Sequence, residues 1–148
     1  MAPASQYGLM ESWPLCDDQW TKREITWTDD MEEFRRQYWA ANKTFNPIKF
    51  RPDRWASLAK SCGFKYLLFT TKRHDGFCMF DTKTTDYRIT APDCPFSTHK
   101  YADIAGSLFK AFRDEGLGIS AYGGNHKGDP FRVSAGSPRG RPYRGRRI

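Results

Sequence analysis

A short polar segment contains the side chains of this sequence that are best suited to binding a ligand. Lys72 and Arg73 provide cationic hydrogen-bond donors, and a neutral His74 ring donates and accepts at the same time. Asp75 could orient His74 or a ligand hydroxyl, and Gly76 permits a tight turn. Sugar hydroxyls need donors and acceptors together, so this combination favours sugar recognition. The alternative interpretation is an ordinary charged loop that follows a strand.

The elements around this segment place it at the end of a strand. Residues 64–70 are apolar and aromatic and predict a buried parallel strand, and residues 117–122 predict the next strand. Helices are expected before and between these strands, at residues 29–41, 52–62 and 99–115. This order predicts an α/β fold in which helices flank a parallel sheet. Ligands bind beyond the carboxyl ends of the strands in such proteins, which is where the polar segment falls.

Apolar residues at helical spacing predict which side of each helix is buried. The first helix should bury Met31, Phe34, Tyr38 and Ala41, the second Trp55, Leu58, Ala59 and Cys62, and the third Ile104, Leu108, Ala111 and Phe112. Residues 77–98 form a long loop, and long loops of this kind often carry function.

The positive charge of the chain is concentrated at one end. The formal net charge is +7, but seven of the 24 basic residues lie in 123–148 beside a single acidic residue, Asp129. This segment is rich in Gly, Pro, Ser and Arg and predicts a disordered tail. Nucleic acid is therefore not expected as a partner of the folded part, and only the basic tail could bind it. No apolar run approaches the roughly 20 residues of a membrane span, and residues 1–10 lack the regions of a secretory signal, which leaves the compartment open.

The cysteines and histidines argue against a metal site. None of the four cysteines forms a C-x-x-C pair, and the three histidines are scattered, whereas zinc ligands usually come in close pairs. We therefore expect buried free thiols, no metal and no cofactor.

A longer stretch around the polar segment resembles a known family. Residues 69–83 read FTTKRHDGFCMFDTK and are similar to the signature of the family-29 glycoside hydrolases, the α-L-fucosidases, and Thr85-Asp86-Tyr87 follows at the expected distance. Residues 45–50, residues 116–122 and Glu11-Ser12-Trp13 resemble the flanking parts of the family pattern. The resemblance covers roughly residues 9–122.

The resemblance implies a fold and a reaction. Members of the family fold as (β/α)8 TIM barrels, which need about 250 residues, so this chain would be an incomplete barrel fragment with a disordered tail. The intact enzyme would hydrolyse terminal α-linked L-fucose from fucosylated glycans by a retaining double displacement. That mechanism uses two carboxyl groups, and both are expected beyond residue 122, which leaves no catalytic residue in this chain.

The resemblance also implies substrate contacts. His74 matches the second histidine of the family pair, which contacts fucose hydroxyls, and Tyr122 and Trp13 match aromatic residues close to the sugar. Arg73 stands where the family usually has its first histidine. Since arginine is always charged and only donates, recognition at Arg73 should differ from that of an imidazole.

Two regions follow from these patterns. Residues 1–122 are expected to form the partial fucosidase-like barrel, and residues 123–148 a basic tail that is disordered or not native to the fold. The alternatives are a non-catalytic sugar-binding fragment and, with less support, a nucleic-acid-binding protein that works through its basic tail.

Overall fold

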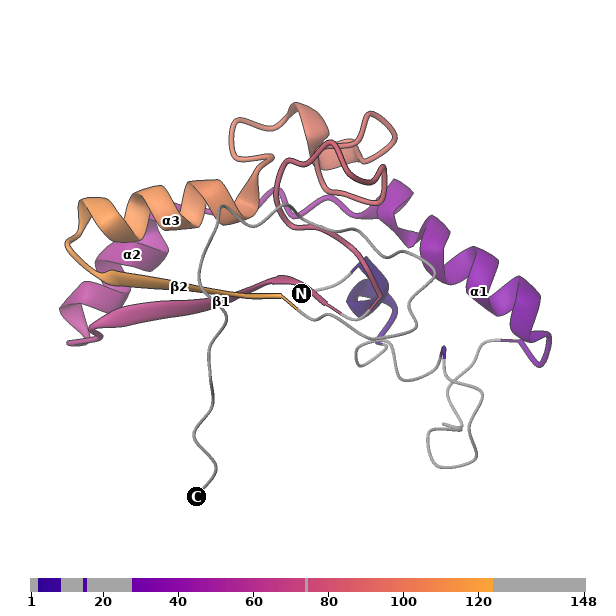
Figure 1. Cartoon of the computed structure of the whole chain (residues 1–148), viewed down its shortest axis with the longest axis horizontal. Helices are drawn as coiled ribbons and strands as arrows, with labels where there is room; N and C mark the ends of the chain where they lie inside the picture. Colours follow the sequence, from indigo (N-terminus) through magenta and orange to yellow (C-terminus); the bar gives the residue numbers. More distant parts are fainter. Residues whose placement is uncertain (1–2, 9–14, 16–27, 74, 124–148) are drawn as a thin grey trace, which may run out of the picture.

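The computed structural model describes residues 3–8, 15, 28–73 and 75–123. In chain order its elements are the 3-10 helix η1 (Pro3–Tyr7), α1 (Met31–Ala40), the 3-10 helix η3 (Ala41–Thr44), α2 (Pro52–Ser61), β1 (Tyr66–Lys72), the 3-10 helix η4 (Pro95–Thr98), α3 (Ile104–Asp114) and β2 (Gly118–Gly123). Figure 1 shows α2 and α3 together on one side of the strands, with α1 at the opposite end of the molecule.

The two strands form the parallel sheet that the sequence predicts. Tyr66 pairs with Gly118 and Thr70 with Tyr122, and a register shift then brings Lys72 opposite Gly123. Both strands end at the same edge, from which the polar segment continues. The expected α/β organisation, with helices flanking parallel strands, is confirmed for the described part of the chain.

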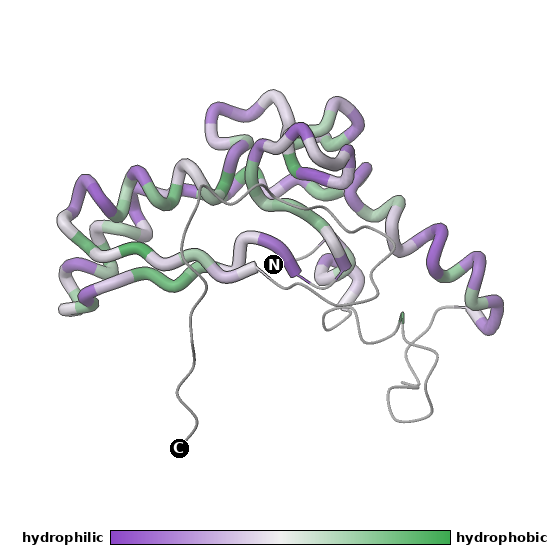
Figure 2. The backbone as a smooth tube through the Cα atoms, viewed as in Figure 1, coloured by the Kyte–Doolittle hydropathy of each residue, from purple (hydrophilic) through white to green (hydrophobic). Residues whose placement is uncertain are grey.

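The main core lies between the sheet and the two helices above it. Leu67, Phe69 and Ile119 point from the strands into a cluster that α2, α3 and the long loop complete. The tube in Figure 2 is hydrophobic along the middle of β1 and alternates in hydropathy along the helices. This alternation is what a helix needs in order to bury one side and expose the other.

Only one face of the sheet is covered by the described residues, so the prediction of a fully buried strand is wrong for β1. Tyr66 and Leu68 lie on the opposite face from Leu67 and Phe69 and are 67% and 61% exposed. Successive side chains of a strand point to opposite faces, and α2 and α3 occupy a single face. An apolar run indicates that both faces are suited to burial, but it does not supply the second covering layer.

The helix α2 forms over the predicted residues but buries a different side. Trp55 and Leu58 are 48% and 64% exposed, and Cys62 is exposed as well. The core contacts of α2 come from Ala56, which has no exposed surface, and from the partly buried Ala59, the one residue of the predicted set that packs there. The small residues Ala56 and Ala59 thus face the core, and the larger Trp55 and Leu58 are left exposed.

The other two helices bury the sides that their periodicity predicts. In α1, Phe34 and Tyr38 are buried and pack with Ala4 of η1 in a second small cluster. The α1 helix begins after Asp30, whose carboxylate accepts hydrogen bonds from the backbone N–H groups of Glu32 and Glu33. Such a cap satisfies donors that the first turn leaves unpaired.

The helix α3 begins later than predicted, because residues 95–98 form η4 and a turn follows it. Asp103 caps α3 by accepting a 2.7 Å bond from the backbone N–H of Gly106. Its predicted face is confirmed, since Ile104, Leu108, Ala111 and Phe112 are all buried. Gly116 follows α3 with a φ of +73°, a conformation that favours glycine and turns the chain toward β2.

The expectation of buried thiols holds for two of the three described cysteines. Cys78 and Cys94 are buried, whereas Cys62 is exposed, and Cys16 lies outside the described residues. Burial raises the pKa of both the Cys78 and the Cys94 thiols, which keeps them protonated and unreactive.

Within the described ranges, no helix has both the length and the apolar character needed to cross a membrane.

Candidate functional site

The polar segment begins on β1 and folds back onto it. The strand continues through Lys72, two residues further than predicted. The chain then reverses, and the backbone N–H of Met79 donates a 2.9 Å bond to the carbonyl of Thr71. The residues between 72 and 78 therefore form a loop at the carboxyl edge of the sheet, which is where ligands bind in parallel α/β folds.

Asp75 anchors this loop from the inside. It is only 5% exposed. One carboxylate oxygen accepts a 3.1 Å bond from the backbone N–H of Phe77, and the other accepts a 3.2 Å bond from the Tyr38 hydroxyl. The indole N–H of Trp39 donates to the Asp75 carbonyl at 3.4 Å. Two adjacent residues of α1 thus hold a loop that lies 36 or 37 positions later in the chain.

The electrostatics of Asp75 follow from this environment. Burial raises the pKa of its carboxyl group, because a charge is less stable away from water. The hydrogen bonds from Phe77 and Tyr38 and the positive charge of Arg73 act in the opposite direction. Because both carboxylate oxygens have protein partners, Asp75 is placed to shape the loop.

The turn after Asp75 is completed by glycine and an aromatic pair. Gly76 has a φ of +86°, a backbone conformation that residues other than glycine adopt only with strain. Phe77 is buried and meets the ring of Tyr87 edge-on, with ring centres 5.0 Å apart, and the ring of Phe45 at 5.8 Å. Burial raises the pKa of the Tyr87 hydroxyl well above its usual range, so this phenol stays neutral.

Two of the four predicted contact residues can be placed in the structure. Arg73 is half-buried, immediately beyond the end of β1, and its carbonyl accepts a 3.1 Å bond from the N–H of Gly76. Tyr122 is 53% exposed near the end of β2, and its carbonyl accepts a 3.0 Å bond from the Thr71 hydroxyl. Both therefore lie at the same edge of the sheet. His74 and Trp13 fall outside the described residues.

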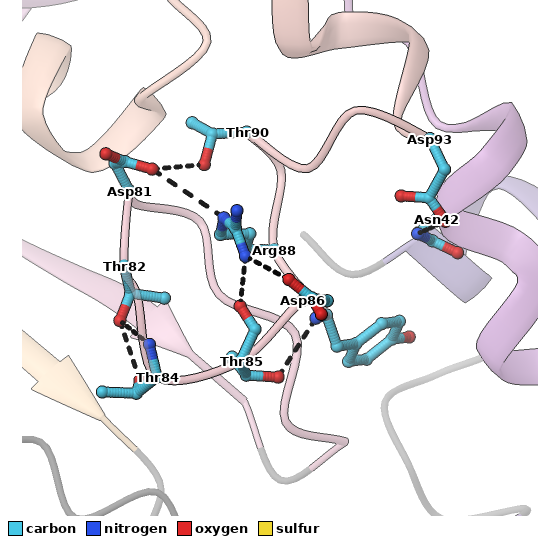
Figure 3. A network of polar contacts seen from close by, with 10 residues as sticks. Asn42, Asp81, Thr82, Thr84, Thr85, Asp86, Arg88, Thr90 and Asp93 are labelled. Carbon is cyan, nitrogen blue, oxygen red and sulfur yellow. Dashed lines mark hydrogen bonds and ion pairs between the residues drawn. The ribbon is translucent and has the colours of Figure 1, made fainter.

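The next loop is organised around one arginine (Figure 3). Arg88 is largely buried, with 18% of its side chain exposed. Its terminal nitrogen Nη1 donates to the Thr85 carbonyl at 2.5 Å and to the Asp86 carboxylate at 2.9 Å. The Asp81 carboxylate lies 3.8 Å from Nε and also accepts a 2.7 Å bond from the Thr90 hydroxyl.

Backbone contacts join this loop to the polar segment. The backbone N–H of Cys78 donates to the carbonyl of Tyr87 at 3.1 Å. The Cys78 carbonyl accepts a 2.9 Å bond from the backbone N–H of Ile89. The sequence suggested that the 77–98 loop carries function but did not single out Arg88 or Tyr38. Arg88 could have been noticed as a cation between nearby acidic residues. Tyr38 carried no such signal, because its position in α1 is also that of an ordinary core residue.

Comparison with known proteins agrees with the resemblance noted in the sequence. The profile of the family described as Alpha-L-fucosidase matches residues 5–139. Alpha-L-fucosidase 1 of Arabidopsis thaliana is 29% identical over 93 residues, covering 60% of this chain and 18% of that protein. A putative alpha-L-fucosidase 1 of Oryza sativa subsp. japonica is 33% identical over 78 residues, covering 53% and 14% respectively.

Solved structures give the same result. A GH29 alpha-L-fucosidase from Bacteroides thetaiotaomicron superposes with a TM-score of 0.54 at 36% identity, covering 60% of this chain and 19% of that one. Alpha-L-fucosidase AlfC from Lactobacillus casei, solved in complex with alpha-L-fucose product, gives the same score and identity and is covered to 26%.

These matches span only part of each relative, between 14% and 26% of its length. The family profile extends past residue 122, into the segment predicted to be a tail. Because the family profile matches residues 5–139, which is most of this chain, the chain belongs to the alpha-L-fucosidase family.

Proposed function

We propose that this chain is the sugar-recognition part of an alpha-L-fucosidase that removes terminal α-linked L-fucose from glycans by a retaining mechanism. The observation that carries the proposal is the loop at the carboxyl edge of the sheet. Asp75 and Gly76 fix its shape, and Arg73 and Tyr122 reach the same edge from neighbouring strands.

In this proposal four residues contact fucose. His74 exchanges hydrogen bonds with sugar hydroxyls, while Tyr122 and Trp13 line the pocket with their rings. The Arg73 guanidinium only donates hydrogen bonds, so it suits a hydroxyl or ring oxygen of the sugar that has a free lone pair. The placement of Arg73 and Tyr122 at one edge supports their share of this assignment.

We further propose that the fold is part of a (β/α)8 barrel, with residues 1–122 as barrel and 123–148 as a separate tail. Parallel sheets are almost always covered on both faces. The exposed Tyr66 and Leu68 lie on the face that would point into the barrel interior. The family profile matches residues 5–139, so it covers the whole of the proposed barrel part from residue 5 and also the first residues of the tail.

A non-catalytic sugar-binding protein is the second candidate, and the described carboxylates favour it for this chain by itself. Asp75 is buried and bonded to Phe77 and Tyr38. Asp81 and Asp86 are both engaged by Arg88. Among residues 28–73 and 75–123, the carboxylates next to the loop thus have structural partners, whereas hydrolysis needs an acid and a nucleophile about 5–5.5 Å apart.

The test uses the full chain with L-fucose and an aryl α-L-fucoside. We expect L-fucose to change the intrinsic tryptophan fluorescence saturably, and His74→Ala to abolish this change. Lys83→Ala, in the exposed part of the next loop, serves as the control and should bind normally. Fucose binding that His74→Ala leaves unaltered would contradict the recognition role. Release of the aryl group by this chain would instead contradict the assignment of both catalytic carboxylates to residues beyond 122.

A further inference from the structure

A hollow lies beside the loop, between α1 and the segment 86–93. It has a volume of about 390 Å³ and is lined by Arg36, Trp39, Ala40, Asn42, Lys43, Asp86, Tyr87 and Asp93. Small-molecule sites in proteins usually enclose about 300–1,000 Å³. The hollow is therefore large enough for one small ligand, and it is distinct from the sheet edge where Arg73 and Tyr122 lie.

Two aromatic rings contribute to its walls, and both are held in place. Trp39 is half-buried, with its indole N–H bonded to the Asp75 carbonyl at 3.4 Å and its ring 6.2 Å from that of Tyr38. Tyr87 packs edge-on against Phe77. Rings that are already ordered lose little entropy when a ligand packs against them, and a flat ring suits the C–H face of a sugar.

The polar groups of the hollow combine donors with acceptors. Asn42 is only 4% exposed, and its amide nitrogen lies 3.4 Å from an Asp93 carboxylate oxygen. The carbonyl side of an amide accepts, a carboxylate accepts, and the Lys43 ammonium only donates. Figure 3 shows Asn42 and Asp93 facing each other, across from the loop that carries Asp86. A polyhydroxylated ring is a ligand that can use all of these groups.

The charges of the hollow are balanced by their neighbours. Asp86 is paired with Arg88 at 2.9 Å, and Arg36 is paired with Glu33 at 2.5 Å. Among the remaining lining residues, Lys43 and Asp93 carry opposite charges. An anionic ligand would meet the carboxylates of Asp86 and Asp93, and a cationic one would meet Lys43 and Arg36. This balance favours an uncharged ligand.

We propose that this hollow binds a neutral saccharide unit, with Trp39 and Tyr87 as the stacking surface and Lys43, Asn42 and Asp93 as hydroxyl partners. The site stands on its own residues and does not depend on fucose recognition by His74. Its connection to the loop is the bond between Trp39 and the Asp75 carbonyl. A ligand bound in the hollow would therefore affect the Asp75 end of the polar segment through Trp39.

The test follows the Trp39 indole N–H of the full chain by nitrogen-15 NMR, with the signal assigned from Trp39→Phe. The probes are methyl glycosides of D-galactose, N-acetyl-D-glucosamine and L-fucose, with D-glucuronate as the anionic comparison. We expect at least one neutral glycoside to shift the Trp39 signal saturably, and D-glucuronate to bind more weakly. Lys43→Met and Asp93→Ala should each weaken this binding roughly tenfold or more, because each removes a charged hydrogen-bond partner of the ligand.

The control is Lys60→Ala, an exposed lysine near the end of α2, which should leave the affinity unchanged. Lys43 is exposed, so Lys43→Met keeps the test valid if Asp93→Ala does not fold. Absence of a saturable shift with all neutral probes overturns the proposal. So does tighter binding of D-glucuronate, or a shift that both Lys43→Met and Asp93→Ala leave intact.

His74→Ala separates the two sites. A Trp39 shift that this variant abolishes belongs to the polar segment, whereas a shift that persists supports the hollow even if fucose recognition fails.

Discussion

The sheet with its two helices and the loop region beside α1 are stabilised in different ways. In the first region, α2, α3, β1 and β2 bury apolar side chains against one another, and residues such as Leu108 and Ile119 are placed by helical or strand periodicity. In the second region, residues 75–93 have little regular structure and depend on hydrogen bonds that the Asp75 carboxylate accepts and the Arg88 guanidinium donates. The polar segment and the hollow lie in the second region, and only Tyr122 of the candidate-site residues placed here belongs to the first, on β2.

This difference has consequences for how each region tolerates substitution. Burial of apolar surface is non-directional and roughly proportional to area, so the helical region should respond mainly to lost volume. Hydrogen bonds are directional, and a buried polar group that loses its partner is costly. The loop region should therefore respond to changes that leave size almost untouched.

The largest effect should come from the core of the helical region. Leu108 is 1% exposed on α3, and Leu108→Ala should lower the free energy of unfolding by about 2–5 kcal/mol, because it removes buried methyl groups and leaves a cavity. Leu58→Ala is the matched control on α2, where the side chain is 64% exposed, and should stay within about 0.5 kcal/mol. Urea unfolding measures both. Equal losses would mean that the Trp55 and Leu58 side of α2 is buried after all.

A change of a single oxygen atom should reveal the dependence of the loop on polar contacts. Tyr38→Phe removes the hydroxyl that donates to Asp75 at 3.2 Å and keeps the ring packed against Phe34. We expect a loss of about 1–3 kcal/mol in unfolding free energy, since a buried carboxylate oxygen loses its donor. Tyr66→Phe, on the face of the sheet that the described residues leave uncovered, is the control and should have no measurable effect. An unchanged stability of Tyr38→Phe would show that packing alone holds the loop.

A polar contact within the helical region should matter less. Asp103 caps α3 through the N–H of Gly106, and Asp103→Ala should cost about 1 kcal/mol. Asp114→Ala at the other end of α3 removes only an exposed pair with Lys110 and is the control. Thermal unfolding followed by circular dichroism would detect the difference. A loss larger than that of Tyr38→Phe would reverse the contrast between the two regions.

The smallest effect should be a change in pH dependence, because the hydrogen bonds to Asp75 offset part of its burial. Burial raises the folded-state pKa of this carboxyl above its unfolded value. The folded protein then binds the proton more tightly, so the stabilising contribution is complete below the unfolded pKa and is lost as pH rises through the raised folded pKa. The unfolding free energy of the native chain minus that of Asp75→Asn should fall across this interval. Urea titrations at several pH values measure it, and a difference that rises with pH would contradict the assignment.

The elements and the family were accessible from the sequence, but several contacts were not. The spacing of Ile104, Leu108 and Phe112 predicted the buried side of α3 correctly, because α3 has one apolar side. In α2 the apolar residues extend around more than one side, so the sequence did not show that Ala56, and not Trp55, would face the core. Similarly, Asp75 was a candidate to orient His74, and its bond to Tyr38 was not anticipated.

The sequence by itself determined the order of helices and strands, the parallel direction of the sheet and the membership in the alpha-L-fucosidase family. These properties depend on periodicities and motifs that are local along the chain. Only the tertiary structure decided which side of α2 is buried, how Tyr38 and Trp39 hold the loop, and that a hollow forms between α1 and residues 86–93. Such contacts join residues that are tens of positions apart, and no local pattern encodes them.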